Sequence, residues 1–84
     1  MIDYGPLRSL TARARALVSA LERDGFSLDR QRGSHRLYKH PDGRRVTVSF
    51  HRPGDTFVPK TLRSILELQA RWTTADLKRL RLID

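Results

Sequence analysis

The sequence predicts a small α+β domain in which helices cover one face of a three-stranded antiparallel sheet. Three observations lead to this fold class: a helical apolar stripe near the start of the chain, three alternating segments in the middle, and a second helical stripe after them. At 84 residues the chain has the length of one domain. We therefore expect residues 1–84 to form a single domain, with a loosely ordered stretch at residues 1–9.

The first predicted helix carries its apolar side chains at i, i+4, i+7, i+8 and i+11. These positions are Leu10, Ala14, Leu17, Val18 and Leu21. This spacing places them on one face of an amphipathic helix. The Asp24-Gly25 pair that follows is a typical helix stop, because glycine readily adopts the left-handed conformation after the last turn.

Three strands are predicted between residues 26 and 50. Phe26 and Leu28 alternate with polar residues, which indicates a strand with one buried face. Residues 35–40 form the second predicted strand. Residues 44–50 form the clearest one, since apolar β-branched residues alternate with polar ones there. The Pro-Asp-Gly sequence at 41–43 predicts a tight hairpin turn between these two strands.

A second helix is expected to begin near Pro59 or Lys60. Proline is well tolerated in a first helical turn, where its missing N–H has no partner to lose. A short final helix is predicted over residues 73–82, since Thr73 and Asp76 have the spacing of a capping box. The predicted order is therefore helix, three strands, helix and short helix.

The charge of the chain is strongly basic and concentrated in its middle. The net charge is +8, and the stretch from Arg30 to Arg63 holds nine basic and only two acidic residues. Such a patch favours a polyanionic partner and is typical of nucleic-acid binders. A protein-docking face or a merely solvated surface are the less specific interpretations. With no apolar run of transmembrane length and no signal peptide, we expect a cytoplasmic protein without a membrane partner.

Few residues in the chain can carry chemistry. The absence of cysteine excludes disulfides, thiolate ligands and cysteine nucleophiles. The sequence has no phosphate-binding glycine loop, serine elbow or paired carboxylates. The three histidines, His35, His40 and His51, have no acidic residues grouped with them, so we expect neither a metal site nor a cofactor.

His35 has the most suggestive surroundings of the three histidines. It follows Gly33-Ser34 and lies between Arg32 and Arg36. A neutral imidazole can accept the proton of a ribose 2′-hydroxyl, and neighbouring cations can stabilise charge on a phosphate. Taken alone, a histidine near a turn is more often a bystander. His40 is expected to be structural, and the role of His51 at the end of the third strand is left open.

Three ordered motifs resemble one known family. They are Gly33-Ser34-His35, the segment Tyr-Lys-His-Pro-Asp-Gly-Arg-Arg-Val-Thr-Val at 38–48, and Lys-Thr-Leu-Arg-Ser-Ile-Leu at 60–66. Over about residues 14–82 the chain is similar to the HicA toxins of HicAB toxin–antitoxin systems. The resemblance implies a double-stranded-RNA-binding-domain-like α-β-β-β-α fold, an mRNA-cleaving ribonuclease, and a HicB-like antitoxin that blocks it. The family's catalytic histidine in the Gly-Ser-His motif falls on His35.

The resulting hypothesis is a metal-independent endoribonuclease toxin that acts on single-stranded mRNA, with His35 as general base or acid at the 2′-hydroxyl. The RNA-binding residues that we expect are Arg32, Gly33, Ser34, Arg36, Lys39, Arg44, Arg45, Lys60 and Arg63. The alternatives are a non-catalytic RNA-binding module of the same fold and a DNA-binding adaptor that uses residues 60–82. A degenerate toxin that only binds its antitoxin is a further possibility.

Overall fold

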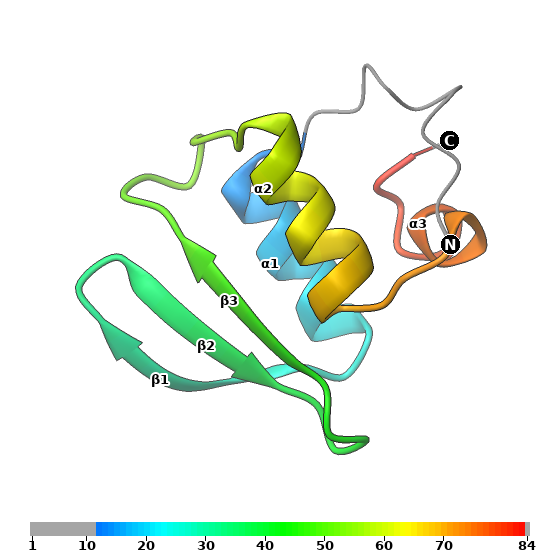
Figure 1. Cartoon of the computed structure of the whole chain (residues 1–84), viewed down its shortest axis with the longest axis horizontal. Helices are drawn as coiled ribbons and strands as arrows, with labels where there is room; N and C mark the ends of the chain where they lie inside the picture. Colours follow the sequence, from blue (N-terminus) through cyan, green and yellow to red (C-terminus); the bar gives the residue numbers. More distant parts are fainter. Residues whose placement is uncertain (1–11, 84) are drawn as a thin grey trace.

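A computed structural model describes residues 12–83 of the chain and has helices on one face of a three-stranded antiparallel sheet (Figure 1). The elements, in order, are α1 (Ala14–Arg23), β1 (Ser27–Arg32), β2 (His35–Lys39), β3 (Arg45–Ser49), α2 (Pro59–Arg63), η1 (Ser64–Gln69) and α3 (Thr74–Arg79). This order confirms the predicted α+β class and the α-β-β-β-α arrangement with a short C-terminal helix. The expected loose stretch at residues 1–9 lies outside the described residues.

The sheet has the order β1-β2-β3 and separates a buried face from an uncovered one. Val46 and Val48 of β3 are fully buried against the helices, as their alternation predicts. Tyr38 of β2 is buried on the same face, opposite Val46. Leu37, paired with Thr47, therefore lies on the uncovered face.

The edge strand β1 departs from the predicted alternation. A β-bulge shifts its register between Leu28, which pairs with Tyr38, and Arg30, which pairs with Leu37. All residues of β1 are exposed, and Leu28 is 49% exposed rather than buried. The bulge also changes which side chains share a face, because one inserted residue inverts the alternation beyond it. Arg30 and Arg32 consequently lie on the uncovered face with Leu37.

The core lies between the sheet and the helices. Its fully buried large side chains are Trp72, Leu17, Leu21, Ile65, Leu66, Leu77, Leu80, Val46 and Val48. Leu10, which the sequence places at the start of the apolar stripe, is outside the described residues. The described part of the stripe is confirmed, since Ala14, Leu17 and Leu21 are buried in α1.

The second helix begins at Pro59, as predicted, but changes from α to π geometry after Arg63. The π-helical segment η1 bonds to the free edge of β3: the Oε1 atom of Gln69 accepts the N–H of Thr47 at 2.8 Å. The Nε2 atom of Gln69 donates to Ser64 Oγ at 3.1 Å. The side chain of Gln69 thus covers part of a strand edge that would otherwise present an unpaired amide.

Asp24 connects three parts of the fold through its carboxylate, which is 9% exposed. The carboxylate accepts the indole N–H of Trp72 at 2.8 Å, lies 2.8 Å from Arg79 Nη2, and lies 3.1 Å from Arg44 Nη1. Burial alone would raise the pKa of Asp24. The hydrogen bonds from Trp72 and Arg79 and the nearby guanidinium charges outweigh burial and lower this pKa.

The neighbouring turn and the last helix begin with specific local contacts. Gly25 has φ of +101°, and a Cβ placed there would lie 2.9 Å from His40 Nε2, so both conformation and space favour glycine. His40 donates from Nε2 to the Asp24 carbonyl at 2.7 Å and accepts the Asp42 N–H on Nδ1 at 3.0 Å. Its ring is therefore part of the folded framework.

α3 begins with the predicted capping box of Thr73 and Asp76.

None of the helices within residues 12–83 has both the length and the apolar character needed to cross a membrane.

Candidate functional site

His35 opens β2 on the uncovered face of the sheet. It pairs with Arg32 of β1 on one side and with Ser49 of β3 on the other, and its side chain is exposed. The Gly33-Ser34 turn before it is tight, with Gly33 at φ of +59°. The turn thus presents the imidazole to solvent at one end of the sheet, as a reaction with a large substrate requires.

An open pocket of about 370 Å³ lies beside His35. Its lining residues come from all three strands and are Arg30, Gln31, Arg32, His35, Leu37 and Thr47. Two guanidinium groups, one imidazole and one leucine side chain line the same depression. This combination suits a ligand with both an anionic group and a flat, less polar part, which is the character of a nucleotide.

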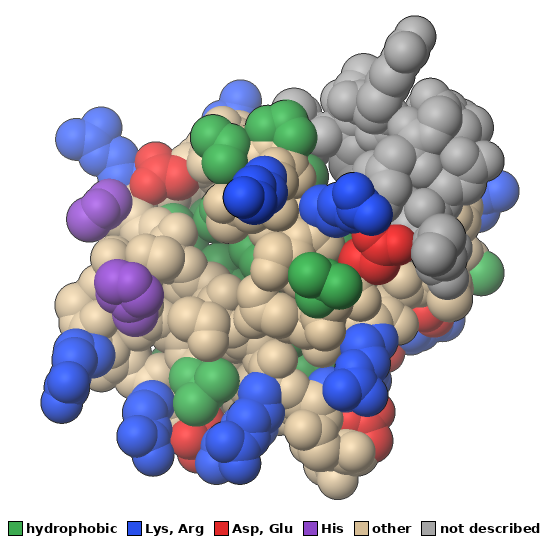
Figure 2. Space-filling view, in the orientation of Figure 1, with side chains coloured by type: hydrophobic (Ala, Val, Ile, Leu, Met, Phe, Trp, Pro, Cys, Tyr) green, Lys and Arg blue, Asp and Glu red, His purple; other side chains and the backbone are tan. Residues whose placement is uncertain are grey.

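Four cations share the uncovered face with His35: Arg30 and Arg32 on β1, Lys39 on β2 and Arg45 on β3. Among the ion pairs of residues 12–83, the carboxylate that balances this group is Asp29, at 3.3 Å from Lys39 Nζ and 3.6 Å from Arg30 Nε. In Figure 2, lysine and arginine side chains are spread over the visible face, and several lie along its lower edge, where Figure 1 shows the strands. The face therefore carries an excess of positive charge.

Sequence reasoning missed Arg30, Gln31, Leu37 and Thr47 as site residues. The period-two alternation could have found Leu37 and Thr47. Tyr38, Val46 and Val48 are buried, so their neighbours along each strand must lie on the other face of the sheet. For Arg30 the same alternation misleads, because counting from Leu28 assigns it to the helix-covered face. Only the bulge places Arg30 beside His35.

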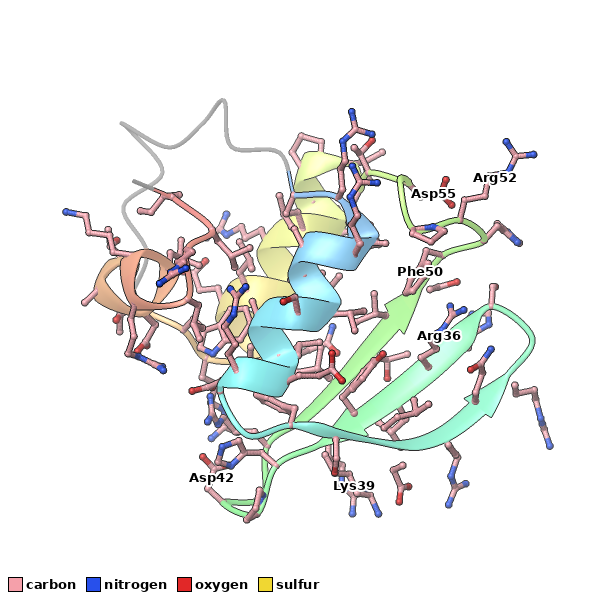
Figure 3. The ribbon with its side chains drawn as sticks, turned by 180° about the vertical axis from the view of Figure 1, so that it is seen from behind. Arg36, Lys39, Asp42, Phe50, Arg52 and Asp55 are labelled. Carbon is pink, nitrogen blue, oxygen red and sulfur yellow. The ribbon has the colours of Figure 1, made fainter. Side chains whose placement is uncertain are left out.

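Arg36 lies on the opposite face of β2 from His35 and makes contacts inside the fold (Figure 3). Its Nη1 atom donates to the carbonyl oxygens of Phe50 at 3.0 Å and Ser34 at 3.2 Å. Its guanidinium carbon is 3.8 Å from the centroid of the Phe50 ring. Ser34 is bonded to β3 as well, through its hydroxyl at 3.2 Å from that of Ser49. Both residues therefore fix the turn that precedes His35.

A protein-family model described as the HicA toxin of bacterial toxin–antitoxin systems matches residues 14–70, which is more than half of the chain. The chain belongs to the HicA toxin family. A comparison with curated proteins finds no match. The matched range runs from the first residue of α1 to the residue after η1, so it includes the sheet, His35 and the pocket. The predicted family assignment is thereby confirmed.

Arg44 of this HicA family member is half-buried and engaged with groups of the protein. Its guanidinium lies 2.8 Å from Asp42 and 3.1 Å from Asp24, and it donates to the Ala70 carbonyl at 2.7 Å. It also lies 4.9 Å from the centroid of the Phe26 ring. These contacts join the hairpin turn to α1 and to the end of the second helix. The structure does not bring Arg44 to the pocket beside His35.

The other predicted binding residues divide between the sheet and the second helix. Arg32 lines the pocket, and Lys39 and Arg45 lie on the same face. Lys60 and Arg63 are exposed on α2, away from the pocket lining, and Arg63 pairs with Glu67 at 3.0 Å. The second helix therefore offers a basic region separate from the lining of the pocket.

The loop after β3 holds His51 and is tied down by Asp55 (Figure 3). The carboxylate of Asp55 accepts the backbone N–H of His51 at 2.9 Å and of Arg52 at 3.1 Å. The bonds from Arg52 and His51 lower the pKa of Asp55. The loop is also joined to α1, because the Asp55 carbonyl accepts the Ala14 N–H at 2.8 Å. The backbone that carries His51 is thus fixed at both sides.

No three His, Cys, Asp or Glu side chains within the described range, residues 12–83, are grouped so that they could hold a metal ion.

Proposed function

We propose that this HicA family member is a cytoplasmic endoribonuclease toxin that cleaves single-stranded mRNA without a metal or other cofactor. Membership of the toxin family supports the role in a toxin–antitoxin system. The observation that carries the enzymatic proposal is the exposed His35 in a pocket that also contains Arg30 and Arg32. A HicB-like antitoxin is the proposed partner that neutralises the activity.

In the proposed reaction, the imidazole of His35 accepts the proton of a ribose 2′-hydroxyl. The 2′-oxygen then attacks the adjacent phosphorus, which yields a 2′,3′-cyclic phosphate on one product and a 5′-hydroxyl on the other. Arg30 and Arg32 are suited to stabilise the negative charge that develops on the phosphoryl oxygens, because their guanidinium groups line the same pocket.

We propose that the RNA backbone follows the uncovered face of the sheet. Arg32, Lys39 and Arg45 share this face with His35, and Arg30 joins them. The aliphatic side chain of Leu37 provides a surface on which a base can pack. By contrast, the internal contacts of Arg36 and Arg44 support structural roles for these two residues. Gly33 and Ser34 would act by shaping the turn, and Lys60 and Arg63 remain candidates for a more distant stretch of RNA.

The test is cleavage of a single-stranded oligoribonucleotide by purified protein in excess chelator. We expect the wild type to produce fragments ending in a 2′,3′-cyclic phosphate. His35→Ala should lose about 100-fold or more of the rate while keeping its thermal unfolding temperature and its RNA affinity. The matched control is Lys78→Ala, an exposed change on α3, which should cleave as the wild type does.

Two results would count against the proposal. Undiminished cleavage by His35→Ala would exclude this histidine as the reacting base. Intact RNA after long incubation with a wild-type protein that binds it would favour the non-catalytic RNA-binding module instead. A ribonuclease and a non-catalytic RNA-binding module would both bind RNA in a salt-sensitive way, so a binding measurement alone does not distinguish these two functions.

A further inference from the structure

We propose that His51 is the proton donor to the leaving 5′-oxygen in the cleavage reaction assigned above to His35. The inference rests on that proposed function and adds the second half of the proton transfer. Three features carry it: the position of His51 in the sheet register, the contacts that fix its backbone relative to His35, and the chemistry of the remaining groups at this end of the sheet.

The antiparallel register brings the two histidines to one end of the sheet. His35 pairs with Ser49, and His51 lies only two residues beyond Ser49. The Phe50 N–H still donates to the Ser34 carbonyl at 3.2 Å, so the two chains remain side by side up to these residues. Both histidine side chains are exposed.

Arg36 fixes the two histidine-bearing segments to each other. The two carbonyl groups that its Nη1 atom binds belong to Ser34 and Phe50, the residues immediately before His35 and His51. The Asp55 carboxylate accepts the His51 N–H, which belongs to the same peptide group as the Phe50 carbonyl, at 2.9 Å. The backbone at both histidines is therefore held by bonds to fixed partners, which a pair of proton-transfer groups needs for a reproducible separation.

The reaction requires two proton transfers. His35 takes the proton from the 2′-hydroxyl, the 2′-oxygen–phosphorus bond forms, and the bond between phosphorus and the 5′-oxygen breaks. The leaving 5′-alkoxide is strongly basic, so its departure is assisted by a proton from the imidazolium form of His51. His35 gains one proton and His51 loses one, and no oxidant, reductant or metal enters the balance. General acid catalysis of this kind contributes about 100- to 10,000-fold.

The other groups at this end of the sheet are poor proton donors. Arg32 and Arg52 carry guanidinium groups, a type of side chain that does not act as a proton donor in proteins. Asp55 has a lowered pKa and accepts backbone N–H bonds, so it is an ionised acceptor rather than an acid. Among the side chains of this loop, the imidazole of His51 is the remaining group of a type that serves as a general acid in catalysis.

The proposal is tested with two oligoribonucleotides that differ in one atom. One has the normal 5′-oxygen at its single cleavable linkage, and the other has sulfur there, because a thiolate leaves without being protonated. We expect His51→Ala to lose about 100-fold or more on the oxygen substrate and to approach the wild-type rate on the sulfur substrate. His35→Ala should lose activity on both. Arg52→Ala, in the same loop, serves as the matched control and should retain activity on both.

The outcomes distinguish this inference from the ribonuclease proposal. If His35→Ala fails on both substrates while His51→Ala keeps both, the ribonuclease assignment stands and the role of His51 is excluded. An equal loss of His51→Ala on oxygen and sulfur would assign His51 to structure or binding and would also overturn the proposal. If the wild type cleaves neither substrate, the ribonuclease function itself fails. Thermal unfolding of His51→Ala and of the size-conserving His51→Gln checks that both variants are folded.

Discussion

Arg36 contacts backbone carbonyls instead of presenting its charge to solvent. It holds the residues that precede His35 and His51, so its replacement should disturb the reaction geometry more than the affinity for RNA. We expect both Arg36→Gln and Arg36→Lys to lower kcat by up to about 100-fold with little change in KM. Lysine keeps the charge but lacks the planar fork that reaches both oxygens. Steady-state kinetics on a defined oligoribonucleotide would measure the two constants.

The opposite pattern would identify Arg36 as a phosphate contact. In that case Arg36→Gln would raise KM, and Arg36→Lys would restore it, because a phosphate needs only a nearby positive charge. Thermal unfolding of both variants should accompany the kinetics, since the stacking of Arg36 on Phe50 also contributes to the fold.

Asp24 makes the stability of the fold sensitive to acid. Its pKa in the folded chain is below its ordinary value of 3.8, so its contribution is fully present above that pH and is lost as the pH falls through the folded-state pKa. We expect Asp24→Asn to lower the free energy of unfolding at pH 7 by about 3 kcal/mol, since it removes the buried carboxylate that pairs with Arg44 and Arg79. Below pH 3.8 the stability of this variant should change less with pH than that of the wild type. Urea unfolding at pH 7, 4 and 3 measures both effects.

Asp42→Asn is the matched control for Asp24. Asp42 pairs with the same guanidinium, that of Arg44, at 2.8 Å, but its side chain is 46% exposed. Solvent screens such a pair strongly, so we expect a much smaller loss of stability from this variant. Equal losses from the two variants would show that burial of Asp24 does not determine its contribution.

At the scale of whole elements, the π-helical segment η1 owes part of its position to Gln69. Removing the amide in Gln69→Ala leaves the Thr47 N–H without its acceptor and should cost about 1 kcal/mol. The Thr47 amide should then exchange its hydrogen faster than the β3 amides that pair with β2. Gln69→Glu retains an acceptor oxygen and should keep Thr47 protected, whereas unchanged exchange in Gln69→Ala would contradict this role. Amide hydrogen exchange followed by NMR resolves these residues.

The elements best predicted from the sequence are those whose hydrophobic pattern follows from one buried face. β3 and α1 are of this kind, because burial of Val46 and Val48, or of Leu17 and Leu21, imposes the period directly. The burial of Leu28 was predicted wrongly, because this side chain stays 49% exposed on an edge strand although it pairs with the buried Tyr38. The bulge after Leu28 was not predicted, since it depends on how β1 pairs with β2. The π geometry of η1 was not predicted either, because the bonds of Gln69 to Thr47 and Ser64 exist only in the folded chain.

In the candidate site, too, features that depend on neighbouring residues were predicted, and features that depend on contacts between distant residues were not. His35 and its turn were identified from adjacent residues and from a family motif. The internal contacts of Arg36 and Arg44 could not be foreseen, since Phe50 and Asp24, which receive them, are distant in sequence. That His51 and His35 lie at the same end of the sheet likewise depends on the register of β2 and β3. Contacts between residues distant in sequence therefore keep Arg36 and Arg44 out of the pocket lining.

At the scale of the whole molecule, the cations of the uncovered sheet face should dominate the electrostatics of RNA binding. In a His35→Ala background, chosen because the proposed mechanism needs this histidine for cleavage, we expect Arg45→Ala to weaken binding. The slope of log affinity against log salt concentration should fall by about 0.7 for a lost phosphate contact. Lys78→Ala on α3 should leave the slope unchanged, because α3 lies apart from the sheet (Figure 1). Equal changes in the two variants would indicate binding through net charge alone. Titrations at several salt concentrations measure the slopes.

A single layer of sheet separates the hydrophobic core from the candidate site, and β2 contributes to both. Along this strand His35, Leu37 and Lys39 face outward, while Arg36 and Tyr38 face the helices. For a population of variants selected in living cells, the proposed function predicts that changes at the outward positions abolish toxicity but leave the protein abundant. Changes at the inward positions would deplete the protein itself. Along the five residues of β2, variants that escape toxicity would therefore alternate between loss of activity and loss of folded protein.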